Sequence, residues 1–319
     1  MSPAMTLPMG RPMREAFGET VTALADDDPR IVMLDGDLGT STRAELFQRG
    51  HPERFLQMGI AEQNMLGVAA GLASCGLIPF VSTFVAFAVV RPLDQIRVLI
   101  AQPHQNVKII GGYSGLFVGA AGKSHQVVDD ISIMRAMPGM ITVSPADDVE
   151  TGLVIRWAAG YDGPVYVRLV RDATQRLFDD AYAFTPGRAV VVHEGSDVTL
   201  ISTGAQTPRA VDAAGLLADL GISAHVLHVP TLKPLDVAAI VEAAARTDRV
   251  ITVEEHTIIG GLGGAIAETL GEHRPTPIHR LGIRDVFGES ASNADLLDRF
   301  GLSAERVAEQ VARLVGTAA

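Results

Sequence analysis

The chain has 319 residues, of which 47% are hydrophobic and 20% are charged, and its formal net charge is −11. This composition predicts a folded protein with two ordinary domains, and the negative charge argues against broad contact with nucleic acid or an anionic membrane. Cys75 is the single cysteine, which excludes an internal disulfide framework and makes a reducing cytoplasm the expected location. The longest apolar run, residues 78–90, is too short for a membrane span of about 20 residues.

Short β-branched runs alternate with longer amphipathic stretches, a pattern typical of parallel sheets covered by helices. In the first half of the chain, strands are expected at residues 31–34, 77–82, 107–111, 141–144 and 165–169.

The alternation stops over residues 174–188, which we interpret as a linker between domains, and then it resumes. The second half is expected to contain strands at 198–202, 223–228 and 250–254, and helices at 208–220 and after Pro234. We therefore expect an α/β protein with two domains, 1–180 and 188–319, each a largely parallel sheet flanked by helices.

The segment Met58-Gly-Ile-Ala-Glu-Gln-Asn-Met-Leu-Gly is expected to be a loop that leads into a helix. Met65 and Leu72 follow helical spacing, Gly76 can end the helix, and Glu62 falls in its first turn. Small residues along this helix would allow another backbone to approach closely, as at a subunit interface. An acidic residue in a first turn ordinarily complements the helix dipole, so Glu62 alone does not indicate catalysis.

The run Gly-Ile-Ala-Glu-Gln before a helix of small residues resembles the pyrimidine-binding domain of thiamine-diphosphate enzymes. From about Arg14 to its end, the chain resembles the C-terminal half of transketolase, with the pyrimidine-binding domain at 1–180 and the C-terminal domain at 188–319. In that family, the matching glutamate hydrogen-bonds a ring nitrogen of the cofactor. The resemblance therefore implies that Glu62 is catalytic and binds thiamine diphosphate.

The segment Ser82-Thr-Phe-Val-Ala-Phe87 is similar to the family's Thr-Phe-x-x-Phe segment. Two aromatic residues three apart on a helix are ordinarily part of a core. The resemblance implies instead that Phe84 and Phe87 pack on the pyrimidine ring. Val90 stands where transketolases commonly place a third aromatic residue, which implies an altered cofactor wall.

Residues 111–126 form a glycine-rich loop that is expected to lead into a helix capped by Ser124. The loop resembles the family's donor-site loop, which ends in Ser-His-Gln or Thr-His-Gln. This resemblance implies that His125 is catalytic and contacts substrate oxygens near the reacting carbon.

Two residues of this loop depart from the family pattern. Ala121 replaces an aspartate that usually reads a donor hydroxyl, and Tyr113 replaces a histidine near the donor. Lys123 adds a charge nearby. Because hydrogen-bonding groups discriminate strongly between hydroxylated substrates, these departures predict an unusual ketose donor or acceptor.

Four further residues match family positions around the donor phosphate or the cofactor. Arg14, Ser41 and Arg171 match positions near the phosphate, and arginine suits bidentate contact with phosphate oxygens. A surface ion pair with Asp172 is the alternative for Arg171. Asp37 matches an aspartate near the cofactor, and capping of a turn is its alternative.

The family's diphosphate-and-metal motif, Gly-Asp-Gly with a following Asn, is absent from the sequence. The resemblance therefore implies no metal site on this chain, and an N-terminal transketolase subunit that holds the diphosphate with Mg²⁺ or Ca²⁺. Self-association would then give a heterotetramer. Its expected reaction transfers a two-carbon ketol unit from a sugar-phosphate-like ketose to an aldose.

Two other readings stay open. The beta subunit of a 2-oxo-acid dehydrogenase decarboxylase shares this architecture, although Ser124-His-Gln126 and residues 133–138 favour transketolase. A degenerate, regulatory subunit is the second alternative. The presence of Glu62, of both phenylalanines and of His125 argues against it.

Overall fold

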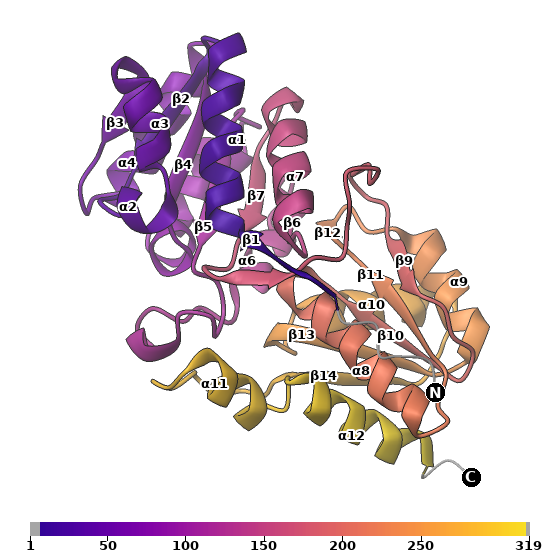
Figure 1. Ribbon diagram of the computed structural model, residues 1–319. Coiled ribbons are helices and arrows are strands. Elements are labelled where there is room, and N and C mark those ends of the chain that lie inside the picture. The colour runs from indigo at the N-terminus through magenta and orange to yellow at the C-terminus, as the bar shows by residue number, and fades with distance from the viewer. Residues whose placement is uncertain (1–6, 317–319) are drawn as a thin grey trace.

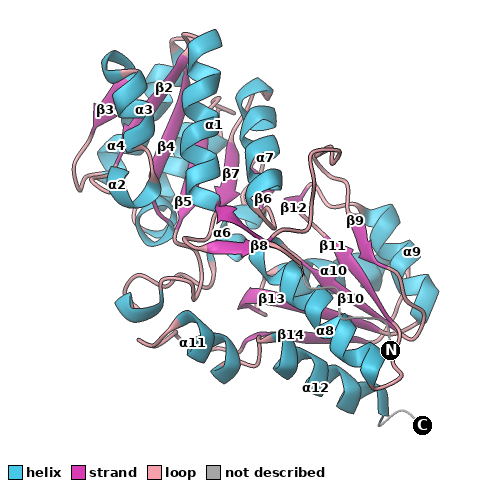
Figure 2. Ribbon diagram, in the orientation of Figure 1, coloured by secondary structure: helices cyan, strands magenta, loops and turns pink. Residues whose placement is uncertain are grey.

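The computed structural model describes residues 7–316, in which helices cover both faces of two separate sheets (Figures 1 and 2). The predicted architecture of two α/β domains with largely parallel sheets is confirmed. Residues 1–6 and 317–319, at the outer ends of the predicted domains, lie outside the described residues.

Within residues 7–316, the first sheet has seven strands, and all neighbouring strands run parallel except the pair β12 and β6. In spatial order they are β12 (Thr231–Lys233), β6 (Ile141–Val143), β7 (Val165–Arg168), β5 (Lys108–Gly112), β4 (Ile78–Phe84), β2 (Ile31–Asp35) and β3 (Phe55–Gln57). The five strands predicted for the first half are all present.

The helical segments of the first half cover this sheet, and several of them are short. They are α1 (Met13–Asp27), α2 (Gly39–Thr42), α3 (Glu45–Gly50), η1 (Pro52–Arg54), α4 (Glu62–Ser74), α5 (Leu93–Gln95), η4 (Gly119–Ala121), α6 (Asp130–Ala136) and α7 (Asp148–Gly160). Two π-helical turns, η2 (Ala86–Val90) and η3 (Ile96–Ala101), lie between β4 and β5.

Strand β2 shows why the sheet is covered on both sides. Ile31 and Met33 join the apolar core that contains α1 and α7, whereas Val32 and Leu34 join the core that contains α4. Because successive side chains of a strand point to opposite faces, a strand with no polar alternation is buried on both. Because β2, β4, β5 and β7 run parallel, their carboxyl ends meet at one edge of the sheet. Parallel sheets ordinarily bind their ligands at this edge.

The second sheet has five strands, with only β9 antiparallel to its neighbour among the described residues. In spatial order they are β14 (Ile278–Ile283), β13 (Val250–Thr257), β10 (Val198–Ser202), β11 (Ala224–His228) and β9 (Val190–His193). Its helical segments are η5 (Gly204–Gln206), α8 (Thr207–Asp219), α9 (Val237–Thr247), α10 (Leu262–His273), α11 (Asn293–Arg299) and α12 (Ala304–Gly316). The strands and helices predicted for this half are present.

Two short strand pairings were not predicted. Strand β12 follows β11 in the chain, yet it extends the first sheet, where Thr231 pairs with Val143 and Lys233 with Thr142. Strands β1 (Met9–Pro12) and β8 (Ala173–Gln175) form a separate antiparallel ribbon. Strand β8 overlaps the start of the segment 174–188, which we interpreted as a linker.

A buried ion network joins the two halves. Arg168, at the end of β7, donates from Nε to Asp130 at 3.0 Å and from Nη2 to the Glu255 carbonyl at 3.0 Å and carboxylate at 3.3 Å. Tyr166 donates to the same Asp130 carboxylate at 2.6 Å. Burial raises the pKa of Glu255 to about 7, although Arg168 opposes that rise.

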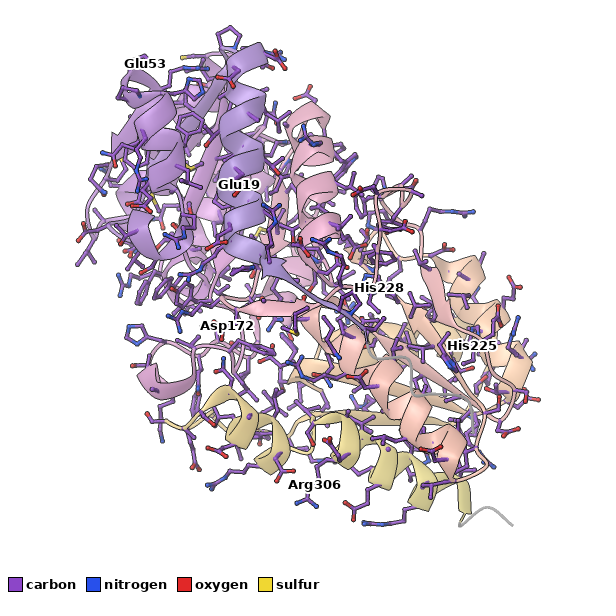
Figure 3. The ribbon with its side chains drawn as sticks, in the orientation of Figure 1. Glu19, Glu53, Asp172, His225, His228 and Arg306 are labelled. Atoms are coloured by element: carbon purple, nitrogen blue, oxygen red, sulfur yellow. The ribbon has the colours of Figure 1, made fainter. Side chains whose placement is uncertain are left out.

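A second buried contact crosses between the halves at His228, the last residue of β11 (Figure 3). Its Nε2 lies 2.9 Å from a carboxylate oxygen of Glu150 on α7, and the Tyr182 hydroxyl donates to the other oxygen at 2.8 Å. Both networks fix the second half against the carboxyl-end edge of the first sheet. No helix among residues 7–316 is long and apolar enough to cross a membrane.

Candidate active site

Glu62 is the first residue of α4, and its side chain is 1% exposed. No side chain caps this helix end, because the preceding residue is Ala61. Arg91 donates from Nη1 to both carboxylate oxygens of Glu62 at 2.8 Å. The predicted helix start is therefore correct, and the carboxylate is held by an arginine that the sequence did not single out.

Phe84 and Phe87 form an aromatic wall next to this ion pair. Their ring centroids lie 6.0 Å apart in a stacked arrangement, and the guanidinium carbon of Arg91 lies 4.2 Å from the Phe87 centroid. The two residues do not share a helix, contrary to expectation. Phe84 is the last residue of β4, where it pairs with Gly112, and Phe87 belongs to the following π-helical turn.

His125 faces both phenylalanines edge-on, at centroid distances of 6.3 Å from Phe84 and 5.5 Å from Phe87. Its Nδ1 lies 2.9 Å from the hydroxyl of Ser124. The prediction that Ser124 caps a helix is wrong, because α6 begins only at Asp130 and the intervening residues form an irregular loop. His125 is therefore presented by a loop, partly exposed, beside the aromatic wall.

The residues predicted to lie near a phosphate gather around Tyr113. Arg14 donates from Nη1 to the Tyr113 hydroxyl at 3.0 Å and to the Ser41 carbonyl at 2.8 Å. The guanidinium carbon of Arg171 lies 5.6 Å from the Tyr113 ring centroid. The same ring stacks on Phe84 with a centroid distance of 3.9 Å. Contacts thus run without a break from Glu62 through the aromatic wall to two arginines.

Arg171 is half-exposed, and its nearest recorded carboxylate oxygen, on Asp172, is 3.9 Å from Nη1. Arg14 lies partly buried on α1, at the start of the helix. The alternative ion pair of Arg171 with Asp172 is thus present but long, and no ion pair of Arg14 is found among the described residues, so both guanidinium groups can still bind an anion.

The other predicted residues lie outside this row of contacts. Asp37 is exposed, with φ of 65°, and its backbone N–H donates to the side chain of Gln57 at 3.1 Å. Ala121 ends a short turn, and Lys123 is exposed. No side-chain contact between these three residues and the aromatic wall is recorded among the described residues.

Asp35 is a buried carboxylate at the same sheet edge that the sequence did not indicate as a site residue. It accepts hydrogen bonds from the Leu38 N–H at 3.1 Å and from Gln57 Nε2 at 2.7 Å, while its Oδ1 has no protein partner. Burial raises its pKa above the usual range. A buried carboxylate directly at a strand end is the signal that would have identified it.

A cleft of about 570 Å³ opens between the halves next to His125. Lys123 and Ser124 line it with Val90, Ile259 and Phe287, and these last three side chains are at least half exposed. Exposed apolar residues around a cleft commonly mark a surface that another molecule covers.

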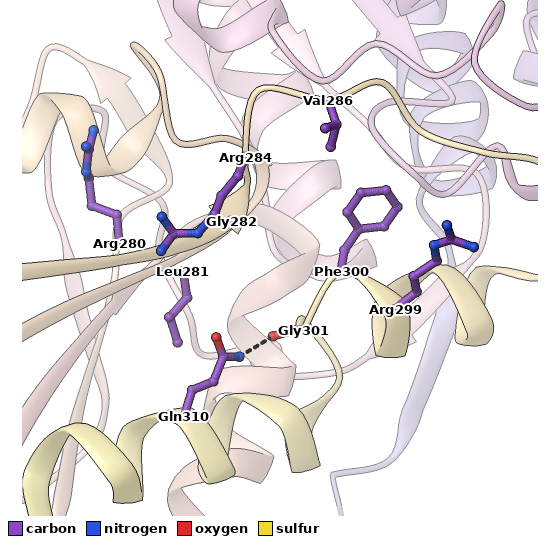
Figure 4. A pocket seen from close by; sticks show the side chains of 9 residues that line it. All are labelled: Arg280, Leu281, Gly282, Arg284, Val286, Arg299, Phe300, Gly301 and Gln310. Carbon is purple, nitrogen blue, oxygen red and sulfur yellow. Dashed lines mark hydrogen bonds between the residues drawn. The ribbon is translucent and has the colours of Figure 1, made fainter.

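A smaller cavity of about 210 Å³ lies in the second half, between β14, α11 and α12 (Figure 4). Arg280 and Arg299 stand at opposite ends of it, and Gln310 donates to the Gly301 carbonyl at 2.8 Å. Arg280 also donates to the Ile258 carbonyl, and Arg299 pairs with Glu289. The guanidinium groups do not converge, and none of the predicted site residues lies here.

Among residues 7–316, no group of three or more His, Cys, Asp or Glu side chains could hold a metal ion. For an aminopyrimidine, in contrast, the chain offers a carboxylate and a flat aromatic ring side by side. Glu62 and Phe87 are both in contact with one planar guanidinium, so the space between them fits a planar group with N–H donors.

Two family models match the chain: the transketolase pyrimidine-binding domain over residues 10–176 and the transketolase C-terminal domain over residues 187–307. A putative transketolase C-terminal section from Methanocaldococcus jannaschii is 43% identical over 302 residues, which cover 94% of this chain and 95% of that relative. The 6-deoxy-6-sulfo-D-fructose transketolase subunit SqwH from Clostridium sp. (strain MSTE9) is 41% identical over 295 residues, 92% of each chain. A solved structure described as a split gene transketolase, inactive beta4 tetramer, is 43% identical with a TM-score of 0.87, and the match covers 96% of this chain and 99% of that one.

Proposed function

The chain belongs to the transketolase family as the counterpart of its C-terminal half, and we propose that, with a separate partner, it transfers ketol units from a ketose to an aldose. One observation carries this proposal. The Glu62 carboxylate is buried beside the wall of Phe84 and Phe87, and His125 faces the same wall.

Thiamine diphosphate, when bound, supplies the acidic carbon and the electron sink that ketol transfer requires. Glu62 would share a proton with a ring nitrogen of its pyrimidine, and Phe84 and Phe87 would lie against the ring. His125 would hydrogen-bond substrate oxygens near the reacting carbon. Asp37, which follows β2 at the same sheet edge, is proposed as a further cofactor contact.

Arg14 and Arg171 would bind an anionic group at the far end of the donor. Ser41 and Tyr113 contact Arg14, so they orient it and border this end of the site. Lys123 would reach the substrate from the cleft that it lines. One relative is described as acting on 6-deoxy-6-sulfo-D-fructose, whose sulfonate is an anion. We propose that this chain takes a ketose with a terminal anion, phosphate or otherwise.

The proposed partner is an N-terminal transketolase subunit, which would hold the diphosphate with Mg²⁺ or Ca²⁺. Two observations support this requirement: the chain lacks the diphosphate motif, and exposed apolar residues surround the cleft beside His125. A similar solved structure is described as a split gene transketolase, inactive beta4 tetramer. We propose that self-association together with the partner gives a heterotetramer, in the cytoplasm that the one free cysteine indicates.

The test is reconstitution of the chain with its partner, thiamine diphosphate and Mg²⁺, followed by a screen of phosphorylated, sulfonated and uncharged ketose donors. We expect ketol transfer only with both subunits, and a loss of about 10³-fold in Glu62→Ala, because a positioned proton-transfer group contributes about 10²–10⁴-fold. Glu53→Ala is the matched control. Glu53 is exposed and precedes β3, at the opposite end of the sheet from the site (Figure 3).

Two results would overturn the proposal. Decarboxylation of 2-oxo acids without ketol transfer would assign the chain to the dehydrogenase type. A stable complex that binds no thiamine diphosphate and transfers no ketol unit would make it a regulatory subunit.

A further inference from the structure

Arg91 contacts the two groups that an aminopyrimidine would need, the carboxylate of Glu62 and the ring of Phe87. Its Nη1 bridges both carboxylate oxygens of Glu62 at 2.8 Å, and its guanidinium carbon lies 4.2 Å from the centroid of Phe87. A guanidinium is planar, presents N–H donors and stacks on aromatic faces. It therefore makes the same two kinds of contact with this chain that the ring of the cofactor is proposed to make.

The surroundings allow Arg91 to leave this position. Its side chain is 45% exposed, and it lies between the π-helical turn η2 and the short helix α5 rather than within a long helix. The side chain of Val90 is exposed and small, so no neighbouring aromatic ring blocks the way out at that position. Glu62, in contrast, is fixed in the first turn of α4 and is buried.

Glu62 also needs a partner when no cofactor is bound. A buried carboxylate that lacks a compensating charge or hydrogen bond strongly destabilises a fold. Arg91 supplies that charge, and it is the only side chain among the described residues recorded in a hydrogen bond or ion pair with the Glu62 carboxylate.

We propose that Arg91 is a placeholder for the cofactor. It occupies the pyrimidine position in the chain without thiamine diphosphate, and cofactor loading exchanges the Arg91–Glu62 ion pair for a hydrogen bond between Glu62 and the pyrimidine. This inference rests on the proposed function, because it names the same ring and the same carboxylate. Arg91 acts here as a positioning residue and takes no part in proton transfer.

The exchange has two measurable consequences. The ion pair stabilises the chain alone, so Arg91→Met should lower its melting temperature. Since the cofactor must displace the guanidinium, removing it should tighten thiamine-diphosphate binding about 5- to 20-fold and speed association, as expected when a competing contact is removed. Arg91→Lys keeps the charge but not the planar stacking, and its cofactor affinity should lie between those of Arg91→Met and the wild type.

The first experiment is a double-mutant cycle on the full chain alone, with Arg91→Met, Glu62→Gln and the double variant compared by thermal unfolding. We expect Arg91→Met to destabilise the wild-type chain more than it destabilises the Glu62→Gln variant. Fully additive effects would show that the pair is not coupled and would overturn the placeholder.

The second experiment measures thiamine-diphosphate binding by calorimetry and stopped-flow in the chain reconstituted with its partner and Mg²⁺. Arg30→Met is the control, because Arg30 also pairs with a carboxylate, that of Asp28, at the opposite end of the sheet. Tighter binding in Arg91→Met but not in Arg30→Met supports the exchange.

Equal or weaker binding in Arg91→Met overturns the placeholder while leaving the proposed function intact, since wild type still binds the cofactor. A wild-type complex that binds no thiamine diphosphate removes the proposed function, and with it the placeholder, whatever the cycle shows.

Discussion

Arg14 and Tyr113 are joined by a hydrogen bond of 3.0 Å, from the guanidinium to the phenol oxygen. They lie 99 positions apart in the chain, on α1 and after β5, and they meet at the edge where the strands of the first sheet end. The tyrosine ring lies close to both arginines and stacks on the ring of Phe84. Tyr113 therefore links the aromatic wall to the proposed anion site.

Replacing Tyr113 should change which ketose the reconstituted enzyme prefers. Tyr113→His introduces the residue type that the family resemblance implies near the donor, and the smaller ring leaves Arg14 free for the ligand. We expect KM for xylulose 5-phosphate to fall about 3- to 10-fold, the worth of one hydrogen bond. Tyr113→Phe, which keeps the ring but gains no polar group, serves as the control. An equal fall in both variants would mean that loss of the phenol, not gain of the imidazole, is responsible.

Replacing Arg171 should impair the use of anionic donors only. Because hydrogen bonds to charged groups are worth about 1.5–3 kcal/mol, Arg171→Met should lower kcat/KM for a phosphorylated ketose about 10- to 100-fold. An uncharged ketose should be used nearly as well as by the wild type. Arg299→Met, at an exposed pair in the second half, is the comparison. A parallel loss on charged and uncharged donors would contradict anion binding and indicate a general defect.

Breaking the buried ion network around Arg168 should lower the stability of the fold more than breaking an exposed ion pair. Arg168→Met leaves the carboxylates of Asp130 and Glu255 buried without their cation, so we expect a loss of about 3–5 kcal/mol in the free energy of unfolding. Arg306→Met, which breaks an exposed pair with Asp298, should lower stability far less, because both groups stay solvated when they are apart. Chemical denaturation measures both. Similar values for the two variants would show that the buried network is replaceable.

Lys108 should make stability depend on pH above neutrality. Its ammonium group is buried and donates to the carbonyls of Tyr161 and Gly163 at 2.6 and 2.7 Å. Burial lowers the pKa of Lys108 to about 7 from its ordinary 10.5. Between those values the unfolded chain binds the proton and the folded chain does not. The free energy of unfolding therefore rises with pH, by at most about 1.4 kcal/mol per unit.

The difference in unfolding free energy between wild type and Lys108→Met isolates this contribution. The wild type should become more stable relative to Lys108→Met as the pH increases from 7 to 9. Urea denaturation of both proteins measures this difference. A difference that stays flat across this range would show that Lys108 keeps its proton inside the fold.

Local pattern predicted the strands and the start of α4, because both follow from side chains close in sequence. The apolar run of β2 is buried on both faces, as its composition indicates. Glu62 begins α4, as the helical spacing of Met65 and Leu72 predicts. The same reasoning could not anticipate that Phe84 stays in a strand, because its backbone is held by Gly112 from a neighbouring strand.

Long-range contacts account for the rest of what the sequence did not reveal. Arg91 lies 29 positions from Glu62, and no local periodicity relates the two. The family resemblance concerns Val90 at this point of the chain and implies no role for the neighbouring Arg91. Nothing local in the sequence sets Asp35 apart from other aspartates, whereas the fold buries it at the end of β2 and pairs it with Gln57 from the end of β3.

Strand β12 bears on how this gene could be recombined with its relatives. Its three residues come from beyond the segment 174–188, yet they complete the outer edge of the first sheet against β6. In a chimaera joined within that segment, β6 of one parent would have to pair with β12 of the other parent. A crossover placed after Lys233 would instead transfer the whole sheet from a single parent.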